Sequence, residues 1–472
     1  MGPVAPVAQL LKEALDDVHA GRFGPAEQKA ARVLRANPSN AQAHYALGLS
    51  ALFRQRPGDA LAPLERAAAL APQDPQYPFV KGMAFAGMGQ VEEAVDAYRA
   101  ALRLRPVFFE ASANLGNLLE RNHRHPEAVE AYEAALRAKP GVPLVLNGLG
   151  LCLLALGDLP RAAECFAQAV AADPNLATAF NNFGIVLGRL KRPQEAIAQL
   201  ERAVRIRPAF PEAWINLGEQ YYMAQRDADA VRALDEALKL DGGNPGIRHL
   251  RDSIAGVQTG RAPDEFIRGF FDRFAADFDK RLVGDLEYRT PQRMAEFLAP
   301  WLAGRQGALA IEDLGCGTGL SGLVLKPFAR RLAGVDLSGK MLDKARERAL
   351  YDELAEDEIA RYLDARPAAG TDLAAAMDVF VYIGDLDSIY AAVARSLAPG
   401  GLFAFSVERL EGEEPYRLAR SGRYAHSAAY LRDLARKHGL VEWKLADSVI
   451  RKEAGQPVTG LLAGFSRPAA GA

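Results

Sequence analysis

Glycines and acidic residues gather in two short segments in the second half of this 472-residue chain. The segment 313–319 reads Asp-Leu-Gly-Cys-Gly-Thr-Gly; an apolar run precedes it, and a stretch of helical composition, 320–329, follows it. This order predicts a strand, a glycine turn and a helix, a geometry that brings a ligand to a helix N-terminus. A second apolar run ends in Asp336, 21 residues after Gly315. An acidic residue there can accept hydrogen bonds from both hydroxyls of a ribose, so we expect a nucleoside-containing ligand.

Two kinds of cofactor could bind at this glycine turn, a dinucleotide or S-adenosylmethionine. Gly317, Gly319 and Gly322 match the G-x-G-x-x-G string of dinucleotide folds, but the first glycine after the strand is Gly315, and in that frame position 320 is leucine. Asp313, just before the glycines, would repel a nearby pyrophosphate, whereas it suits a cofactor whose near end carries an ammonium group. S-adenosylmethionine is such a cofactor, and glycines would let it lie against the backbone because a Cβ would block the approach.

The segment 313–319 also resembles the first motif of class I S-adenosylmethionine-dependent methyltransferases, and the resemblance spans 265–468. It implies an α/β, Rossmann-like fold and S-adenosylmethionine as cofactor. It also implies an acid after the third strand that contacts adenine, for which Asp357 and Glu358 are both candidates. The residues that we assign to the cofactor are Asp313, Gly315, Cys316, Gly317, Gly319, Asp336, Leu337, Asp357, Glu358 and Asp378.

Flanking segments extend the same resemblance. Helically spaced phenylalanines are most often a sign of simple packing. In the family, however, a segment like 271–279 with 288–291 closes over the cofactor as a lid, which would bring Phe274, Phe278 and Arg289 to the site. The segment 397–403 resembles the turn into the fifth strand of these enzymes, and the runs 443–450 and 461–466 suit an antiparallel hairpin.

The methyl acceptor is less marked in the sequence. The resemblance places His426 in a loop beside the acceptor pocket, and a histidine could deprotonate an oxygen or nitrogen acceptor near neutral pH. A histidine that caps the following helix is the alternative. Tyr382 and Asp385 follow the fourth strand, near the methyl group in related enzymes, and are further catalytic candidates. Methyl transfer also proceeds by alignment alone, without a dedicated base. Cys316 lies between two motif glycines, where a structural role is expected.

The first half of the chain is a repeat with a period of 34 residues. Prolines recur in this step from Pro38 to Pro208, glycines from Gly48 to Gly218, and alanines at two further positions of each unit. Each unit is predicted to form two helices, since proline cannot continue a helix and ends each unit. The period, the Leu-Gly pair, the alanines and the proline resemble the tetratricopeptide repeat. We count seven units between 7 and 244, and a stacked solenoid is required to bury their apolar surface.

Three asparagines share one position of their repeats, Asn114, Asn182 and Asn216, which faces the groove in the family. Stacked asparagines can donate to and accept from a peptide backbone, so we expect the groove to bind a protein or peptide. Gly148 interrupts the series, and Asn147 and Asn181 stand one position earlier. Two alternatives are that the asparagines only solvate the groove or bond adjacent turns, and that the repeats self-associate.

We therefore expect two domains: an all-α tetratricopeptide-repeat solenoid over 1–250, a linker over 251–264, and an α/β Rossmann-like class I methyltransferase domain with a helical lid over 265–472. The formal net charge of −2 offers no basic excess for a nucleic acid. The three cysteines fit a reducing compartment and show no zinc-type spacing, so no metal is expected. With no apolar run of membrane length and no signal-peptide pattern, we expect a cytoplasmic protein without membrane contact.

The leading hypothesis is a S-adenosylmethionine-dependent methyltransferase whose repeats recruit a protein or peptide substrate or partner. One alternative is a small-molecule methyltransferase with repeats used for oligomerisation. Another is an assembly scaffold with a vestigial or cofactor-sensing methyltransferase domain.

Overall fold

The computed structural model describes residues 6–275, 278–280, 288–453 and 456–469. The chain divides into two compact units, Met1–Ala224 and Gln225–Ala472, which are described separately below. The sequence rhythm predicts that the solenoid extends to 250, and that limit remains a prediction.

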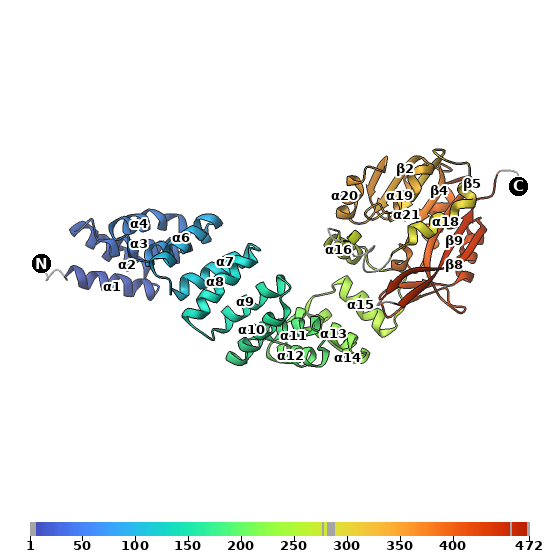
Figure 1. The fold of residues 1–472 in the computed structure, drawn as a ribbon. Helices are drawn as coiled ribbons and strands as arrows, with labels where there is room; N and C mark the ends of the chain where they lie inside the picture. The colour runs from blue at the N-terminus through green and yellow to red at the C-terminus, as the bar shows by residue number, and fades with distance from the viewer. Residues whose placement is uncertain (1–5, 276–277, 281–287, 454–455, 470–472) are drawn as a thin grey trace. The chain divides into compact units, whose positions relative to one another are not determined.

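The first unit consists of helices that pack successively, each against the next (Figure 1). This is the predicted helical solenoid. Its helices are α1 (Val7–His19), α2 (Phe23–Ala36), α3 (Ala41–Phe53), α4 (Pro57–Leu70), α5 (Gln76–Gly87), α6 (Val91–Leu104), α7 (Phe109–Arg121), α8 (His125–Ala138), α9 (Pro143–Ala155), α10 (Leu159–Ala172), α11 (Ala177–Arg189), α12 (Pro193–Ile206) and α13 (Pro211–Met223).

The periodic glycines of the first unit permit close helix packing. A Cβ added at Gly116 of α7 would lie 2.6 Å from the ring of Tyr132 on α8, and one at Gly150 would lie 2.7 Å from the ring of Phe166. Both rings are fully buried. The same contact recurs between the glycines from Gly48 to Gly184 and the large side chain 16 positions later, which is aromatic at Tyr98, Tyr132 and Phe166 and leucine at Leu64 and Leu200. This contact explains why the glycine keeps the 34-residue period.

The second unit combines helices with a nine-stranded sheet in the order β3-β2-β1-β4-β5-β7-β6, in which β9 pairs with β5 and β8. Strands β1 to β5 are parallel, whereas β9 is antiparallel to β5 and β8. The strands are β1 (Leu309–Leu314), β2 (Ala329–Asp336), β3 (Glu353–Glu356), β4 (Thr371–Ala376), β5 (Leu397–Arg409), β6 (Tyr416–Leu418), β7 (Tyr424–His426), β8 (Val441–Glu453) and β9 (Gln456–Ser466).

Helices cover both faces of this sheet. Side chains of one strand alternate between the faces, so Ile311 packs with Met294 of α18, while Leu314 packs with Tyr390 of α22. The central strands are mostly apolar because both of their faces are buried, and Glu312 and Asp313 of β1 are buried charged exceptions. The helices of this unit are α14 (Asp227–Leu240), α15 (Pro245–Ala255), α16 (Asp264–Phe274), α17 (Phe278–Lys280), α18 (Thr290–Leu302), α19 (Gly322–Leu325), α20 (Gly339–Glu347), α21 (Ile359–Asp364), α22 (Asp387–Ser396) and α23 (Ala428–Lys437).

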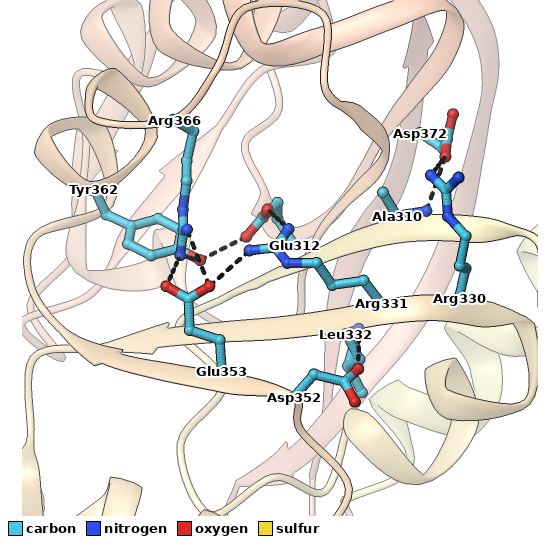
Figure 2. Close-up of polar contacts among 10 residues, drawn as sticks. All are labelled: Ala310, Glu312, Arg330, Arg331, Leu332, Asp352, Glu353, Tyr362, Arg366 and Asp372. Atoms are coloured by element: carbon cyan, nitrogen blue, oxygen red, sulfur yellow. Dashed lines mark hydrogen bonds and ion pairs between the residues drawn. The ribbon is translucent and has the colours of Figure 1, made fainter.

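A buried carboxylate lies inside this sheet. Glu312 of β1 is 2% exposed and accepts hydrogen bonds from Arg331 of β2 at 2.8 Å and from the hydroxyl of Tyr362 on α21 at 2.6 Å. Glu353 and Arg366 complete the group, as Figure 2 shows. These polar contacts join β1, β2, β3 and α21 within an otherwise apolar layer.

Most predicted elements of this unit are confirmed. The predicted hairpin is β8–β9, whereas the segment 397–403, expected as a turn into the fifth strand, is the first part of β5 and contains an irregularity in its register with β4. The helix expected over 320–329 is wrong: α19 ends at Leu325, a 3-10 turn covers Lys326–Phe328, and Ala329 already begins β2. Pro327 removes the backbone donor that a longer helix would need.

The segment predicted as a linker, 251–264, is ordered against the sheet unit. It contains the last turn of α15, and beyond Gly256 it is bonded to the loop after β4. The amides of Gly384 and Asp385 both donate to the carbonyl of Gly260, at 2.8 and 2.7 Å, and the amide of Ala262 donates to the carbonyl of Tyr382 at 2.9 Å. These bonds hold the segment 256–264, hereafter the strap, on the domain.

The β6–β7 hairpin binds the helices that precede the strap. Arg420 in its turn pairs with Asp227 of α14 at 2.6 Å, and the carbonyl of Gly422 lies 2.9 Å from Nε2 of His249 on α15. Both helices therefore pack as part of the second unit. Across the described residues, no helix has the length and apolar character needed to cross a membrane.

Candidate functional site

A cavity of about 320 Å³ opens at the carboxyl ends of β1, β2 and β4. Ligands of parallel α/β sheets bind at this edge. The cavity brings together most of the residues predicted from the sequence. Those that line it are Gly315, Cys316, Gly317, Asp336, Leu337, Asp357, Glu358, Asp378, Tyr382, Phe274 and Phe278.

The glycine turn follows β1 in a conformation that other residues rarely adopt. Gly315, Gly317 and Gly319 have φ angles of 71°, 54° and 84°. A Cβ on Gly315 would lie 2.5 Å from Val379, whereas one on Gly317 would meet no atom within 4 Å. Gly317 thus leaves open space at the cavity wall, as required for a ligand that lies against backbone. Gly319 faces Tyr351 and does not line the cavity.

Asp336 ends β2 with both carboxylate oxygens held by backbone. Oδ2 accepts from the amide of Gly317 at 2.9 Å and Oδ1 from the amide of Ser338 at 2.9 Å. Burial raises the pKa of this carboxyl, and the amide hydrogen bonds act in the opposite direction. The side chain is fixed, and each oxygen can accept a further hydrogen bond from a ribose hydroxyl.

Asp313 lies behind the turn rather than on the cavity wall. It is 1% exposed, and its Oδ2 accepts from Ser321 at 2.5 Å and from Tyr351 at 2.6 Å. Oδ1 is buried without a hydrogen-bond partner among the described residues. Burial raises the pKa of this carboxyl to about 6. Its contacts with Ser321 and Tyr351 support the turn from beneath, so the structure does not place this carboxylate directly against a ligand.

Both candidates for the adenine contact, Asp357 and Glu358, line the cavity. Asp357 accepts from the amide of Glu358 at 2.7 Å and pairs with Arg361, which lowers its pKa. Glu358 caps α21 by accepting from the amide of Arg361 at 3.1 Å.

Cys316 lines the same cavity, and its sulfur packs against Gly334 of β2. The residue is 4% exposed, and burial raises the pKa of its thiol well above the ordinary value. A thiol with a raised pKa is a poor nucleophile, in agreement with the expected structural role.

The helices expected to act as a lid contact the cofactor side of the cavity. Arg268 of α16 donates to the carbonyl of Leu337 at 3.1 Å, and Ser338 donates to Asp272 at 2.6 Å. Thr318 in the glycine turn donates to Asp279 of α17 at 2.5 Å. Arg289, another predicted lid residue, is exposed and does not line the cavity, and 276–277 of the predicted lid lie outside the described residues.

The other half of the cavity is aromatic. Phe270, Phe271 and Phe274 of α16 and Phe278 of α17 line it together with Tyr288 and Tyr382. The rings of Phe271 and Tyr382 meet edge to face, with centroids 5.5 Å apart. Burial raises the pKa of Tyr382, and the neighbouring Arg423 acts against that shift. The cavity thus joins a polar, glycine-walled half to an apolar half from which water is readily excluded.

Two of the three predicted catalytic side chains do not reach the cavity. His426 is fully buried, and its Nε2 lies 2.9 and 3.1 Å from the carbonyls of Ile383 and Gly384, so that nitrogen carries the proton. Burial lowers the pKa of His426 to about 4. Asp385 is exposed, and its Oδ1 accepts from Tyr430 at 3.2 Å. Both hold the loop after β4 in place, and only Tyr382 lines the cavity.

Sequence reasoning missed a buried arginine on the cavity wall. Arg451 of β8 is 3% exposed, donates to Asp378 at 2.9 Å and pairs with Glu408 of β5. A basic residue among the inward-facing positions of a strand was the available signal. Arg261 and Arg423 also line the cavity.

The groove asparagines of the first unit bond to one another. Asn182 donates to Asn147 at 3.0 Å, Asn216 donates to Asn181 at 2.8 Å, and Asn181 donates to Asn182 at 3.2 Å. These contacts link α9, α11 and α13, as the alternative of bonding between adjacent turns requires. Asn114 lies instead beside the hydroxyl of Tyr98. Peptide binding by these side chains remains a prediction.

Fold and site together define a tetratricopeptide-type solenoid joined to a methyltransferase domain. Residues 13–259 match the family described as cilia and flagella-associated protein 70 C-terminal domain, and residues 312–405 match the family described as methyltransferase domain. The first match covers more than half of the chain, so the chain belongs to that repeat family.

Among curated proteins, the chain is similar to an S-adenosyl-L-methionine-dependent Diels-Alderase of Talaromyces variabilis, with 34% identity over 130 residues that cover 26% of this chain and 44% of the relative. It is also similar to trans-aconitate 2-methyltransferase of Paracidovorax citrulli, with 32% identity over 112 residues that cover 23% and 43% of the two chains. The chain thus spans less than half the length of these relatives.

Among solved structures, the repeats are similar to YrrB, described as a TPR protein with an unusual peptide-binding site, with 23% identity, a TM-score of 0.38, and coverage of 40% of this chain and 97% of that one. A repeat protein of Cytophaga hutchinsonii has 15% identity and a TM-score of 0.44, with coverage of 50% and 98%.

The methyltransferase match and the curated relatives imply S-adenosylmethionine as the cofactor. The residues present fit it: the missing Cβ of Gly317 leaves room against the backbone, and the Asp336 carboxylate is held in position by two amides. No group of His, Cys, Asp and Glu suited to a metal ion occurs in the part of the chain that the structure describes.

Proposed function

We propose that this protein is a S-adenosylmethionine-dependent methyltransferase whose repeats bind a protein or peptide that presents the methyl acceptor. The observation that carries the proposal is the left-handed glycine turn after β1 beside the Asp336 carboxylate, on the wall of one cavity. Intact glycines and a fixed acid favour a working cofactor site over a vestigial one.

The chain's residues divide the work of the site. Asp336 would bind and orient the nucleoside hydroxyls, Asp357 or Glu358 would contact the base, and the backbone of Gly315 and Gly317 would hold the amino-acid part. When bound, S-adenosylmethionine supplies an electrophilic methyl group on a positively charged sulfur. The aromatic half of the cavity, which includes Phe271 and Tyr382, aligns the acceptor and excludes water.

The repeats contribute by tethering. A substrate bound to the solenoid stays near the domain, and an attachment of this kind raises the effective concentration of the acceptor to about millimolar for short connections. The near balance of 57 basic and 59 acidic residues favours polar and apolar groove contacts over attraction to a polyanion.

Calorimetric titration of S-adenosylmethionine into the full-length protein tests the cofactor site. We expect saturable binding, and Asp336→Ala should weaken it about 100-fold or more, because two hydrogen bonds to a charged group are each worth about 1.5–3 kcal/mol. Asp364→Ala, at an exposed carboxylate on α21, is the matched control and should bind normally. Absence of saturable binding, or equal binding by Asp336→Ala, contradicts the proposal.

Transfer of labelled methyl groups in a cell lysate tests the role of the repeats. We expect a labelled protein or peptide, and removal of 1–224 should sharply reduce that labelling. Labelling of small molecules that survives the removal would instead favour a small-molecule enzyme with oligomerising repeats. No labelling at all would favour a scaffold with a cofactor-sensing domain.

A further inference from the structure

Asp378 holds a backbone conformation that is costly for its residue type. It follows β4 with a φ of 61°, in the left-handed region, and it lines the cavity. A residue other than glycine in this region is disfavoured, and such strain persists only where the surrounding structure holds it. Here the amide of Asp378 donates to the hydroxyl of Ser406 at 2.8 Å, which fixes the backbone from β5.

A buried arginine fixes the side chain of Asp378 from a third strand. Arg451 of β8 donates to Oδ1 of Asp378 at 2.9 Å and also pairs with Glu408. The side chains of Arg451, Glu408 and Asp378 are 2%, 15% and 17% exposed. A guanidinium held between two carboxylates has little freedom, so Oδ1 of Asp378 has a defined position.

The second carboxylate oxygen has no such engagement. Among the described residues, none donates a hydrogen bond to Oδ2 of Asp378, and the side chain lies on the wall where the aromatic half begins, close to Tyr288 and Tyr382. A carboxylate oxygen accepts hydrogen bonds and does not donate them. The ligand group that matches Oδ2 therefore carries an N–H or O–H.

We propose that Asp378 is a catalytic residue that selects an amine or hydroxyl acceptor, an inference that rests on the proposed methyltransferase function. Oδ2 accepts the hydrogen bond of the acceptor N–H or O–H and so directs its lone pair. The acceptor loses one proton for each methyl group that it gains; this proton passes to Oδ2 and then to water. Arg451 is the positioning residue. Asp378, first assigned to the cofactor, thus belongs to the acceptor half.

Binding of two aromatic probes tests this assignment without turnover. Calorimetry of the full-length protein saturated with S-adenosylhomocysteine would compare 2-phenylethylamine with 3-phenylpropanoate, which differ in the polar group. We expect the amine to bind about 10- to 100-fold more tightly, as one hydrogen bond to a charged group predicts. Asp378→Asn should remove most of this preference, and Asp364→Asn, outside the cavity, should retain it.

Arg451→Lys separates positioning from folding. It keeps the charge but loses the planar fork that orients the Asp378 carboxylate, so the amine preference should fall when it is measured well below the unfolding temperature of the variant. Equal binding of both probes to the wild type, or an undiminished preference in Asp378→Asn, would overturn the proposal. A wild-type protein that binds S-adenosylmethionine but not the amine refutes only this inference, whereas failure to bind S-adenosylmethionine refutes the proposed function.

Discussion

A single added Cβ atom at the glycine turn is expected to affect stability at one position and ligand binding at another. Gly315 and Gly317 have similar backbone angles, yet a Cβ on the first would collide with Val379 and a Cβ on the second would enter open space at the cavity wall. The two positions therefore differ in what an alanine would disturb.

Gly317→Ala should lower S-adenosylmethionine affinity by about tenfold or more, because its methyl group occupies space at the cavity wall. Its stability should fall by about 1–2 kcal/mol, the cost of a left-handed alanine. Gly400→Ala is the matched control: Gly400 has a φ of 78°, open surroundings and no place on the cavity wall. Calorimetry and denaturant unfolding would measure both, and equal loss of affinity in the two variants contradicts the cofactor placement.

Protonation of His426 should destabilise the protein in acid. The pKa of about 4 in the folded state lies below the ordinary 6.5 because His426 is buried beside Tyr416 and Tyr430, and its hydrogen bonds to two carbonyls act in the opposite direction. The unfolded chain therefore binds this proton first, and the stability contributed by neutral His426 is lost as pH falls below 6.5. The free energy of unfolding should drop by about 2 kcal/mol between pH 7.5 and pH 5 from this group.

Unfolding of His426→Gln at the two pH values isolates that contribution. The variant keeps an N–H donor but does not titrate, so its loss of stability in acid should be about 2 kcal/mol smaller than that of the wild type. An identical pH dependence would show that His426 titrates normally in the folded protein, and would restore it as a candidate base.

At the level of elements, the hydroxyl groups of two buried tyrosines are expected to have opposite effects on the stability of the sheet domain. Tyr362 of α21 donates to the buried Glu312 (Figure 2), whereas the hydroxyl of Tyr390 on α22 is buried without a partner among the described residues. One hydroxyl satisfies a buried charge and the other is desolvated without compensation.

Tyr362→Phe should destabilise the protein by about 1.5–3 kcal/mol, because Glu312 loses a charge-assisted hydrogen bond inside the sheet. Tyr390→Phe should be neutral or stabilising by up to about 1 kcal/mol, because it removes a buried hydroxyl that has no partner. Denaturant unfolding of the full chain measures both, and the order of stability is the test. Equal effects would show that Glu312 does not depend on α21.

At the level of the whole molecule, the cavity lies entirely within the second unit, and α14 and α15 belong to that unit through the β6–β7 hairpin. The place where the chain is cut should therefore decide the stability of a fragment more than the repeat count does.

A fragment of 225–472 should bind S-adenosylmethionine with an affinity within about twofold of the full chain. A fragment of 256–472 loses the contacts of Asp227 and His249 and the packing of α15, worth about 2 kcal/mol or more. Its unfolding temperature should be lower by about 4–8 °C at this size. Thermal unfolding of the two fragments measures the difference, and equal temperatures would show that the helices are only adjacent to the domain.

The sequence by itself determined the features that depend on local order. A 34-residue period specifies stacked helix pairs, and a strand followed by spaced glycines specifies a turn that can hold a nucleoside beside Asp336. The helix after that turn was misjudged at this level, because Pro327 ends it early.

Tertiary structure decided the rest, because burial and pairing join residues that are distant in the chain. It removed His426 and Asp385 from the acceptor side, since the loop after β4 packs over the first and leaves the second outside. It brought Arg451 to Asp378 from 73 residues away, through the pairing of β9 with both β5 and β8. The order of the strands in the sheet decides which acidic and basic side chains meet at its edge. That order cannot be predicted from any single segment of the sequence.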